Sequence, residues 1–151
     1  DNFLHGKKDA GMEEIRHAAQ GAQISDFIDS LESGYQTCVS QGGSNFSGGQ
    51  RQRLSIARAL VKRPEIYIFD DSFSALDFKT DARLRAALRE EVRDAAVILV
   101  AQRISTIMDA DQIVVLDEGR VAGTGTHREL MESCQVYQQI AQSQLSEEEL
   151  A

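Results

Sequence analysis

The sequence predicts an α/β fold with a parallel sheet, preceded by a helical segment. Residues 66–69 and 96–100 are short apolar runs with the length of buried strands. Between them, residues 79–93 place leucine and valine at intervals of four, which is the spacing of one helix face. A strand, a helix and a second strand in succession indicate a parallel crossover.

The segment before the first strand has helical periodicity. Residues 1–40 carry apolar side chains three and four positions apart, so we expect this part to be helical throughout. Gly, Ser, Gln and Asn dominate residues 40–49, which indicates a loop. A further helix is expected over residues 50–63, and Pro64, the only proline, ends it.

The segment after the second strand predicts a hairpin followed by a helix. Residues 113–116 form a third apolar run, and the sequence Asp-Glu-Gly-Arg at 117–120 turns the chain into residues 121–124. Thr126 and Glu129 have the spacing of a capping box, so a helix is expected to begin there.

Composition limits the kind of protein. A chain of 151 residues can bury one core but not two full domains. Its net charge of -8 opposes binding to nucleic acid, so no nucleic-acid partner is expected. Cys38 and Cys134 lack the close pairing of a zinc site and are expected to be reduced thiols. The longest apolar stretch, residues 95–101, is too short to cross a membrane, which predicts a soluble chain.

A phosphate-binding loop is not predicted anywhere in the chain. Such a loop has glycine at its first position and serine or threonine after its lysine. Gly6 and Lys7 offer a partial match, but Asp1 and Lys8 occupy those two positions. The groups that would enclose the β-phosphate and bind Mg²⁺ through a hydroxyl are therefore missing.

The sequence Ser47-Gly48-Gly49-Gln50 lies where the predicted loop becomes a helix. Glycines let backbone amides approach an anion, and the helix dipole is positive at this end. An ordinary glycine-rich helix start with a serine cap has the same sequence. The four residues alone leave both interpretations open.

The longer sequence resembles that of ABC ATPases. The matching segments are 45–53 (NFSGGQRQR, the signature motif), 57–60 (ARAL), Asp70-Asp71 after the apolar run (Walker B), 74–77 (SALD, the D-loop), 101–106 (AQRIST, the H-switch) and 125–130 (GTHREL). These segments are spread from residue 45 to residue 130, the resemblance runs through the whole chain, and the combination is specific. The resemblance is to exporter-type domains, of which the rear half is present.

The resemblance implies a P-loop NTPase (RecA-like) core that is incomplete here, because the strand leading to the phosphate loop belongs inside the sheet. Residues 1–63 would be a helical subdomain carrying the signature loop, residues 64–145 the rear part of the core, and residues 146–151 an acidic tail. Either a longer polypeptide or another copy would cover the open strand edges.

The resemblance also implies roles for individual residues. Two such domains close head to tail, so the signature loop of one contacts the ATP held by the other. Asp70 would hold Mg²⁺ through water, which suits a carboxylate, and Asp77 would lie at the seam between the domains. The residues expected to bind nucleotide in trans are Ser47, Gly48, Gly49 and Gln50.

Two positions depart from the family pattern. Asp71 stands where a glutamate usually polarises the attacking water, and Gln102 stands where the switch histidine is expected. The Asp71 side chain is one methylene shorter than glutamate, and the Gln102 side chain, unlike histidine, cannot titrate near neutral pH. This pair predicts a catalytically degenerate site in a heterodimeric exporter. Its partners would be a different ATPase chain with intact residues and a transmembrane domain at the cytoplasmic face of the membrane.

Three other functions remain open from the sequence. One is a homodimeric, slow ABC ATPase in which the two substitutions arose independently. Another is a regulatory module that binds nucleotide without hydrolysing it. A chromosome-maintenance ATPase is disfavoured, because there is no sustained heptad pattern and the chain is acidic. His17 and His127 are interpreted as structural, the latter beside a helix cap.

Overall fold

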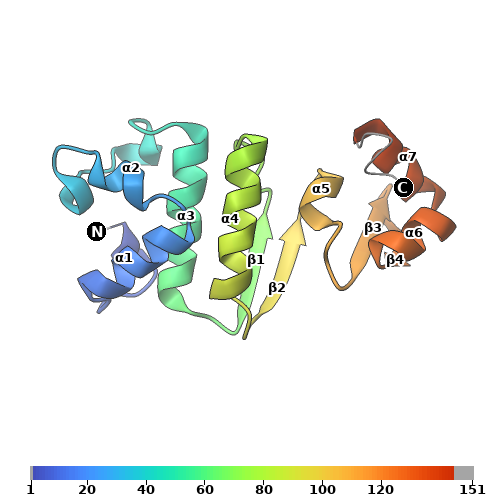
Figure 1. The fold of residues 1–151 in the computed structure, drawn as a ribbon, viewed down its shortest axis with the longest axis horizontal. Helices are drawn as coiled ribbons and strands as arrows, with labels where there is room; N and C mark the ends of the chain where they lie inside the picture. Colours follow the sequence, from blue (N-terminus) through green and yellow to red (C-terminus); the bar gives the residue numbers. More distant parts are fainter. Residues whose placement is uncertain (1, 145–151) are drawn as a thin grey trace. The chain divides into compact units, whose positions relative to one another are not determined.

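The computed structural model describes residues 2–144, so the predicted acidic tail at 146–151 lies outside the described residues. The chain divides into two compact units, residues 1–100 and residues 101–151 (Figure 1). Each unit is described by itself below. The predicted boundary between residues 63 and 64 falls within the first unit and stays a prediction.

The first part of unit 1 is a group of helices. Its 3-10 helices are η1 (Phe3–His5), η2 (Gly34–Gln36) and η3 (Gln41–Gly43), and its α-helices are α1 (Met12–Gly21), α2 (Ser25–Asp29) and α3 (Gly48–Lys62). The prediction of helix throughout residues 1–40 is wrong at residues 6–11, 22–24 and 30–33, which are turns or irregular, and at residues 37–40. There, the Ser40 hydroxyl donates to the Asn45 side chain at 2.8 Å and accepts from the Asn45 amide at 3.2 Å. Such local side-chain bonds compete with helix formation.

Helix α3 begins two residues earlier than the sequence predicts. Ser47 is its N-cap and forms a capping box with Gln50, in which the side chain of each residue accepts a hydrogen bond from the backbone amide of the other. A serine cap stabilises a helix by about 1 kcal/mol relative to alanine. Arg63 ends the helix in a left-handed conformation (φ 48°) just before Pro64. The buried face of α3 consists of Leu54, Ile56, Ala57, Leu60 and Val61.

The parallel crossover is confirmed. Strand β1 (Ile66–Asp70) pairs in parallel with β2 (Ala96–Val100), and α4 (Phe78–Glu91) connects them. The register sets Ile66 opposite Ala96 and Asp70 opposite Val100. The side chains of Tyr67 and Phe69 are buried and join the core of unit 1.

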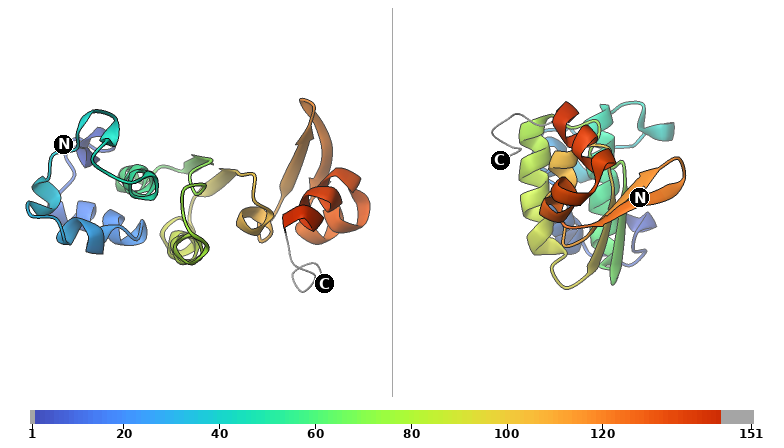
Figure 2. Two further views of the ribbon diagram at one scale, coloured as in Figure 1. Left: turned by 90° about the horizontal axis from the view of Figure 1, so that it is seen from above. Right: turned by 90° about the vertical axis from the view of Figure 1, so that its right-hand side faces the viewer.

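The other face of this sheet is apolar and exposed. Figure 2 shows α4 on one side of β1 and β2. On the opposite face, Ile68 is 67% exposed, and Ile98 and Val100 are 51% and 52% exposed. Parallel sheets are normally covered on both faces. The exposed isoleucines and valine therefore mark a surface that a further part of the fold must cover.

The described part of unit 2, residues 101–144, holds the predicted hairpin and three helices. Strands β3 (Ile113–Asp117) and β4 (Arg120–Gly125) are antiparallel, so the hairpin is confirmed. The helices are α5 (Ile104–Ile107), α6 (His127–Ser133) and α7 (Gln135–Gln144). The predicted capping box of Thr126 and Glu129 opens α6. The core of the unit consists of Ile104, Ile113, Val115, Leu130, Cys134, Tyr137 and Ala141.

The two cysteines are free thiols, Cys38 exposed and Cys134 buried. Among residues 2–144, none of the helices combines the length and apolar character that crossing a lipid bilayer would require.

We expect the 151-residue chain alone to self-associate through the bare face of β1 and β2, and Ile68→Lys to reduce that association. The physical reason is that the side chain of Ile68 is two-thirds exposed on an apolar parallel sheet. Sedimentation velocity and binding of an apolar dye would measure both effects. Gln142→Lys, which adds the same charge at an exposed position of α7, is the matched control. Equal behaviour of the two variants would contradict the prediction.

Candidate nucleotide-binding site

The signature loop forms the first turn of α3. The Ser47 hydroxyl accepts from the Gln50 amide at 3.3 Å, and the Ser47 amide donates to the Gln50 side-chain oxygen at 2.8 Å. The hydroxyl keeps its own proton for donation. The amides of Gly48 and Gly49 lie in the first turn, where a helix provides no acceptor. The positive end of a 15-residue helix therefore presents donors suited to an anion.

The two glycines of this loop also have a packing role inside the chain. A Cβ atom on Gly48 would lie 3.2 Å from the Cβ of Ala75. One on Gly49 would lie 3.1 Å from both the Ala75 carbonyl oxygen and the Leu76 side chain. The predicted D-loop thus packs directly against the predicted signature loop. The sequence predicts the glycines for approach to an anion but gives no sign of this contact.

Asp70 and Asp71 lie at the carboxyl end of β1 and are exposed. The amide of Asp71 donates to the carbonyl of Val100 at 2.9 Å, which is the last link to β2. Among residues 2–144, no group of three or more acidic, histidine or cysteine side chains could hold a metal. The ligand role expected for Asp70 would therefore be that of a single carboxylate. Such a donor fits Mg²⁺, which takes most of its ligands from water and phosphate.

Asp71 adopts a left-handed backbone conformation, with φ of 47°. Asp and Asn adopt this conformation more readily than most residues with side chains. The hydroxyl of Ser74 donates to the Asp71 carbonyl at 3.1 Å. A left-handed turn therefore directs the chain out of β1 and into the D-loop.

Gln52 on α3 holds this turn and is not among the residues that the sequence predicts. Its side-chain nitrogen donates to the carbonyl of Asp71 at 3.1 Å and to the hydroxyl of Ser74 at 3.0 Å. Its side-chain oxygen accepts from the amide of Ala75 at 3.0 Å. The only sign in the sequence is helical spacing, since Gln52 lies four residues before the buried Ile56.

Asp77 is the N-cap of α4. Its carboxylate accepts from the Thr80 amide at 2.9 Å and from the Thr80 hydroxyl at 2.7 Å. These two hydrogen bonds, the backbone one first, lower the pKa of Asp77 below its ordinary value of 3.8. The carboxylate is therefore held by its own chain, and its expected place at a domain seam stays a prediction.

Gln102 lies in unit 2, and its side chain is exposed. Its carbonyl accepts from the side-chain nitrogen of Gln144 at 2.8 Å, and the Gln144 oxygen accepts from the Ile104 amide at 2.9 Å. The end of α7 thus holds the predicted H-switch segment through one amide side chain. Gln144 is a second functional candidate that the sequence does not predict.

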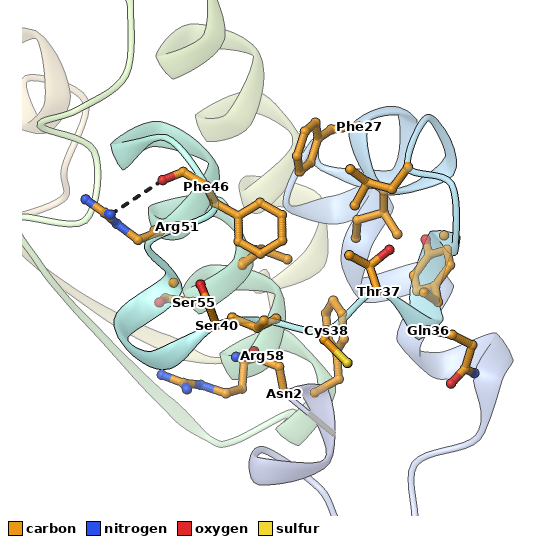
Figure 3. Close-up of a pocket in the computed structure, with 18 of the residues that line it drawn as sticks. Asn2, Phe27, Gln36, Thr37, Cys38, Ser40, Phe46, Arg51, Ser55 and Arg58 are labelled. Carbon is orange, nitrogen blue, oxygen red and sulfur yellow. Dashed lines mark hydrogen bonds between the residues drawn. The ribbon is translucent and has the colours of Figure 1, made fainter.

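A cavity of about 580 Å³ lies in the helical part of unit 1. Figure 3 shows Phe27 and Phe46 among its lining residues, and Arg51 donating to the carbonyl of Phe46 at 3.4 Å. The hydroxyl of Thr37, which also lines it, is buried without a hydrogen-bond partner among the described residues. None of the predicted site residues lines this cavity, although two of its lining residues, Phe46 and Arg51, belong to the signature segment 45–53.

The two predicted structural histidines have structural partners. The Nδ1 atom of His127 is 2.8 Å from the hydroxyl of Tyr137, within the core of unit 2. His17 lies on α1 with its Nδ1 atom 3.4 Å from the carboxylate of Glu91.

The cap on α4 predicts a pH dependence that can be measured. Because the native pKa of Asp77 is lowered, its contribution to stability is complete above the unfolded value and is lost as pH falls through the native value. An asparagine at this position would cap the helix at every pH, since its side-chain oxygen does not titrate. In urea unfolding from neutral to acid pH, Asp77→Asn should therefore lose less stability than wild type.

Asp94→Asn is the control for this measurement, since the Asp94 side chain is 94% exposed. The prediction fails where Asp77→Asn and wild type lose stability in parallel as the pH falls.

Comparisons with known proteins agree with this architecture. Residues 3–74 match the ABC transporter family. An uncharacterized ABC transporter ATP-binding protein of Bacillus subtilis is 44% identical over 98% of this chain and 26% of its own length. The ATP-dependent lipid A-core flippase of Chromobacterium violaceum is 42% identical over 97% of this chain and 25% of its own. The chain thus spans about a quarter of these relatives.

A solved structure of a bacterial Atm1-family ABC exporter with ATP bound matches this chain with a TM-score of 0.92 and 41% sequence identity. The match covers 97% of this chain and 26% of the exporter chain. The fold is accordingly that of the P-loop NTPases, of which only a part is present. The resemblance to ABC transporter ATPase domains, which the signature loop and the two acidic residues after β1 indicate, is confirmed. The chain belongs to the ABC transporter family and carries part of its ATP-binding domain.

Proposed function

We propose that this chain is the rear part of an ATP-hydrolysing domain that powers export across a membrane. The observation that carries the proposal is the start of α3, where the Ser47 hydroxyl and the amides of Gly48 and Gly49 share one helix turn. The likeness to exporter domains, one of them with ATP bound, supports the choice of ligand. The transmembrane partner and a place at the cytoplasmic face of the membrane are part of this proposal.

The signature loop acts in trans. In the ABC family two ATPase domains close head to tail, so the donors at the start of α3 meet the nucleotide of the second domain. They bind the γ-phosphate of an ATP held by a second ABC ATPase domain. Gln50 supports them by fixing the Ser47 backbone, and its side-chain nitrogen remains available for donation.

The chain's own site binds nucleotide better than it hydrolyses it. ATP, when held there by the front part of the domain, supplies the phosphates and Mg²⁺ that Asp70 would complement. Asp71 carries the carboxylate expected to polarise water, one methylene shorter than glutamate, and a shift of about 1 Å can cost roughly a hundredfold in rate. Gln102 can donate a hydrogen bond but cannot move a proton.

A different partner chain follows from this asymmetry. It would carry the glutamate and the histidine that this chain lacks, and its site would be completed by Ser47, Gly48 and Gly49. The alternative is a homodimer with two slow sites, which the same two substitutions, Asp71 and Gln102, also allow.

In the assembled transporter, we expect Ser47→Arg to lower ATP turnover by roughly a hundredfold or more, because a long cation replaces a donor in a preorganised anion site. Gln102→Ala should change turnover by less than about twofold, because its site contributes little. Ser133→Arg, at the exposed end of α6, controls for the added charge. Steady-state phosphate release measures all three, and equal collapse of the first two variants would establish the homodimer instead.

The chain alone is expected to hydrolyse no ATP above background, because the residues that enclose the β-phosphate are absent from it. A phosphate-release assay on the purified chain with ATP and Mg²⁺ tests this directly. Turnover that persists through purification and disappears in Asp70→Ala would refute the assignment.

A further inference from the structure

We propose that Gln52 is a positioning residue that fixes the turn of residues 71–75 to the signature helix, so that the two candidate nucleotide elements of this chain move as one body. The inference rests on the proposed function, since it concerns how the signature loop and Asp71 are coupled. It assigns no contact with substrate to Gln52.

The first step is the geometry of the Gln52 side chain. It is half-buried, and one amide group serves three partners, namely the Asp71 carbonyl, the Ser74 hydroxyl and the Ala75 amide, at 3.0 to 3.1 Å. A primary amide is a neutral side-chain group that donates and accepts from adjacent atoms in this way. A glutamate could accept from the amide of the turn but could not donate to its carbonyl, and a leucine could do neither.

The second step is the conformation that these bonds hold. Asp71 has a left-handed backbone, which residues with side chains adopt only where the surroundings maintain it. Its amide is bound by Val100 on β2, and its carbonyl is bound by Gln52 on α3. The Asp71 carboxylate therefore takes its direction from two elements, of which one carries the signature loop.

The third step is the direct packing of the same segments. A Cβ atom on Gly48 or Gly49 would lie 3.1 to 3.2 Å from Ala75 or Leu76, so the backbone of the helix start runs close to these two residues. Leu76 is itself buried in the core of unit 1. Gln52 lies one turn after Gly48 on the same helix. A displacement of the helix start toward an anion would thus carry the turn with it, because hydrogen bonds and close packing both join them.

The coupling has a consequence for the reaction. Because the turn braces the first turn of α3, loss of the Gln52 bonds would let the signature loop shift at the partner's ATP, which is the site that carries turnover. Loss of the Gln52 bonds should leave nucleotide binding intact while the turn loses its fixed position. The expected signature is a lower kcat with an unchanged KM for ATP.

The experiment compares two variants in the assembled transporter. Gln52→Glu keeps the size and the acceptor for Ala75 but removes the donor, and Gln52→Leu removes both. We expect each to lower kcat by roughly tenfold, as a misplaced group does, with KM for ATP within about twofold. Amide exchange at Ala75 should quicken in Gln52→Leu and stay slow in Gln52→Glu. Gln142→Glu, at an exposed position of α7, is the matched control.

The outcomes separate this inference from the function on which it rests. Where wild type hydrolyses ATP and Ser47→Arg does not, wild-type kcat in both Gln52 variants overturns the coupling and leaves the function standing. A raised KM with unchanged kcat also overturns it, because Gln52 would then act on nucleotide binding. Where wild type shows no hydrolysis, unchanged exchange at Ala75 in Gln52→Leu still refutes the link.

Discussion

The contact between the first turn of α3 and residues 75 and 76 is the constraint on which the candidate site depends. It favours glycine at positions 48 and 49, because a Cβ there would lie 3.1 to 3.2 Å from Ala75 or Leu76 and would force these neighbours to shift by a few tenths of an ångström. The same glycines open the helix start to an anion. One steric requirement therefore has two consequences, and it joins the proposed trans-acting loop to the turn that follows β1.

The incomplete sheet is the second constraint. Two parallel strands with an apolar outer face do not form a stable sheet on their own. The relatives are about four times as long as this chain, which agrees with a larger domain that covers the face. The core of unit 1 nevertheless orders the start of α3 and the end of β1 without help. The first turn of α3 thus lies against residues of its own unit, whereas the outer face of β1 and β2 stays exposed.

The sequence predicts the elements whose signals are local. The spacing of α4, the apolar runs of β1 and β2, and the capping box of α6 all arise from neighbouring residues, and all are confirmed. Gln52 and Gln144 could not be predicted, because their partners lie 19 to 23 and 40 to 42 residues away. A polar side chain on a half-buried face reveals its partner only when the fold brings the two segments together.

The left-handed backbone at position 71 is a second physical reason for aspartate, rather than glutamate, at this position. Aspartate tolerates this conformation better than glutamate, because its short side chain can bond locally. Asp71→Glu would then extend the carboxylate by one methylene toward the attacking water, but it would destabilise the left-handed turn that Gln52 holds. The proposed loss of catalytic power and the rigid link between α3 and the D-loop are therefore compatible. Because Asp71 is proposed to contribute little to hydrolysis in its own site, its backbone can adopt the conformation that supports the signature loop. That loop is proposed to act at the partner's ATP.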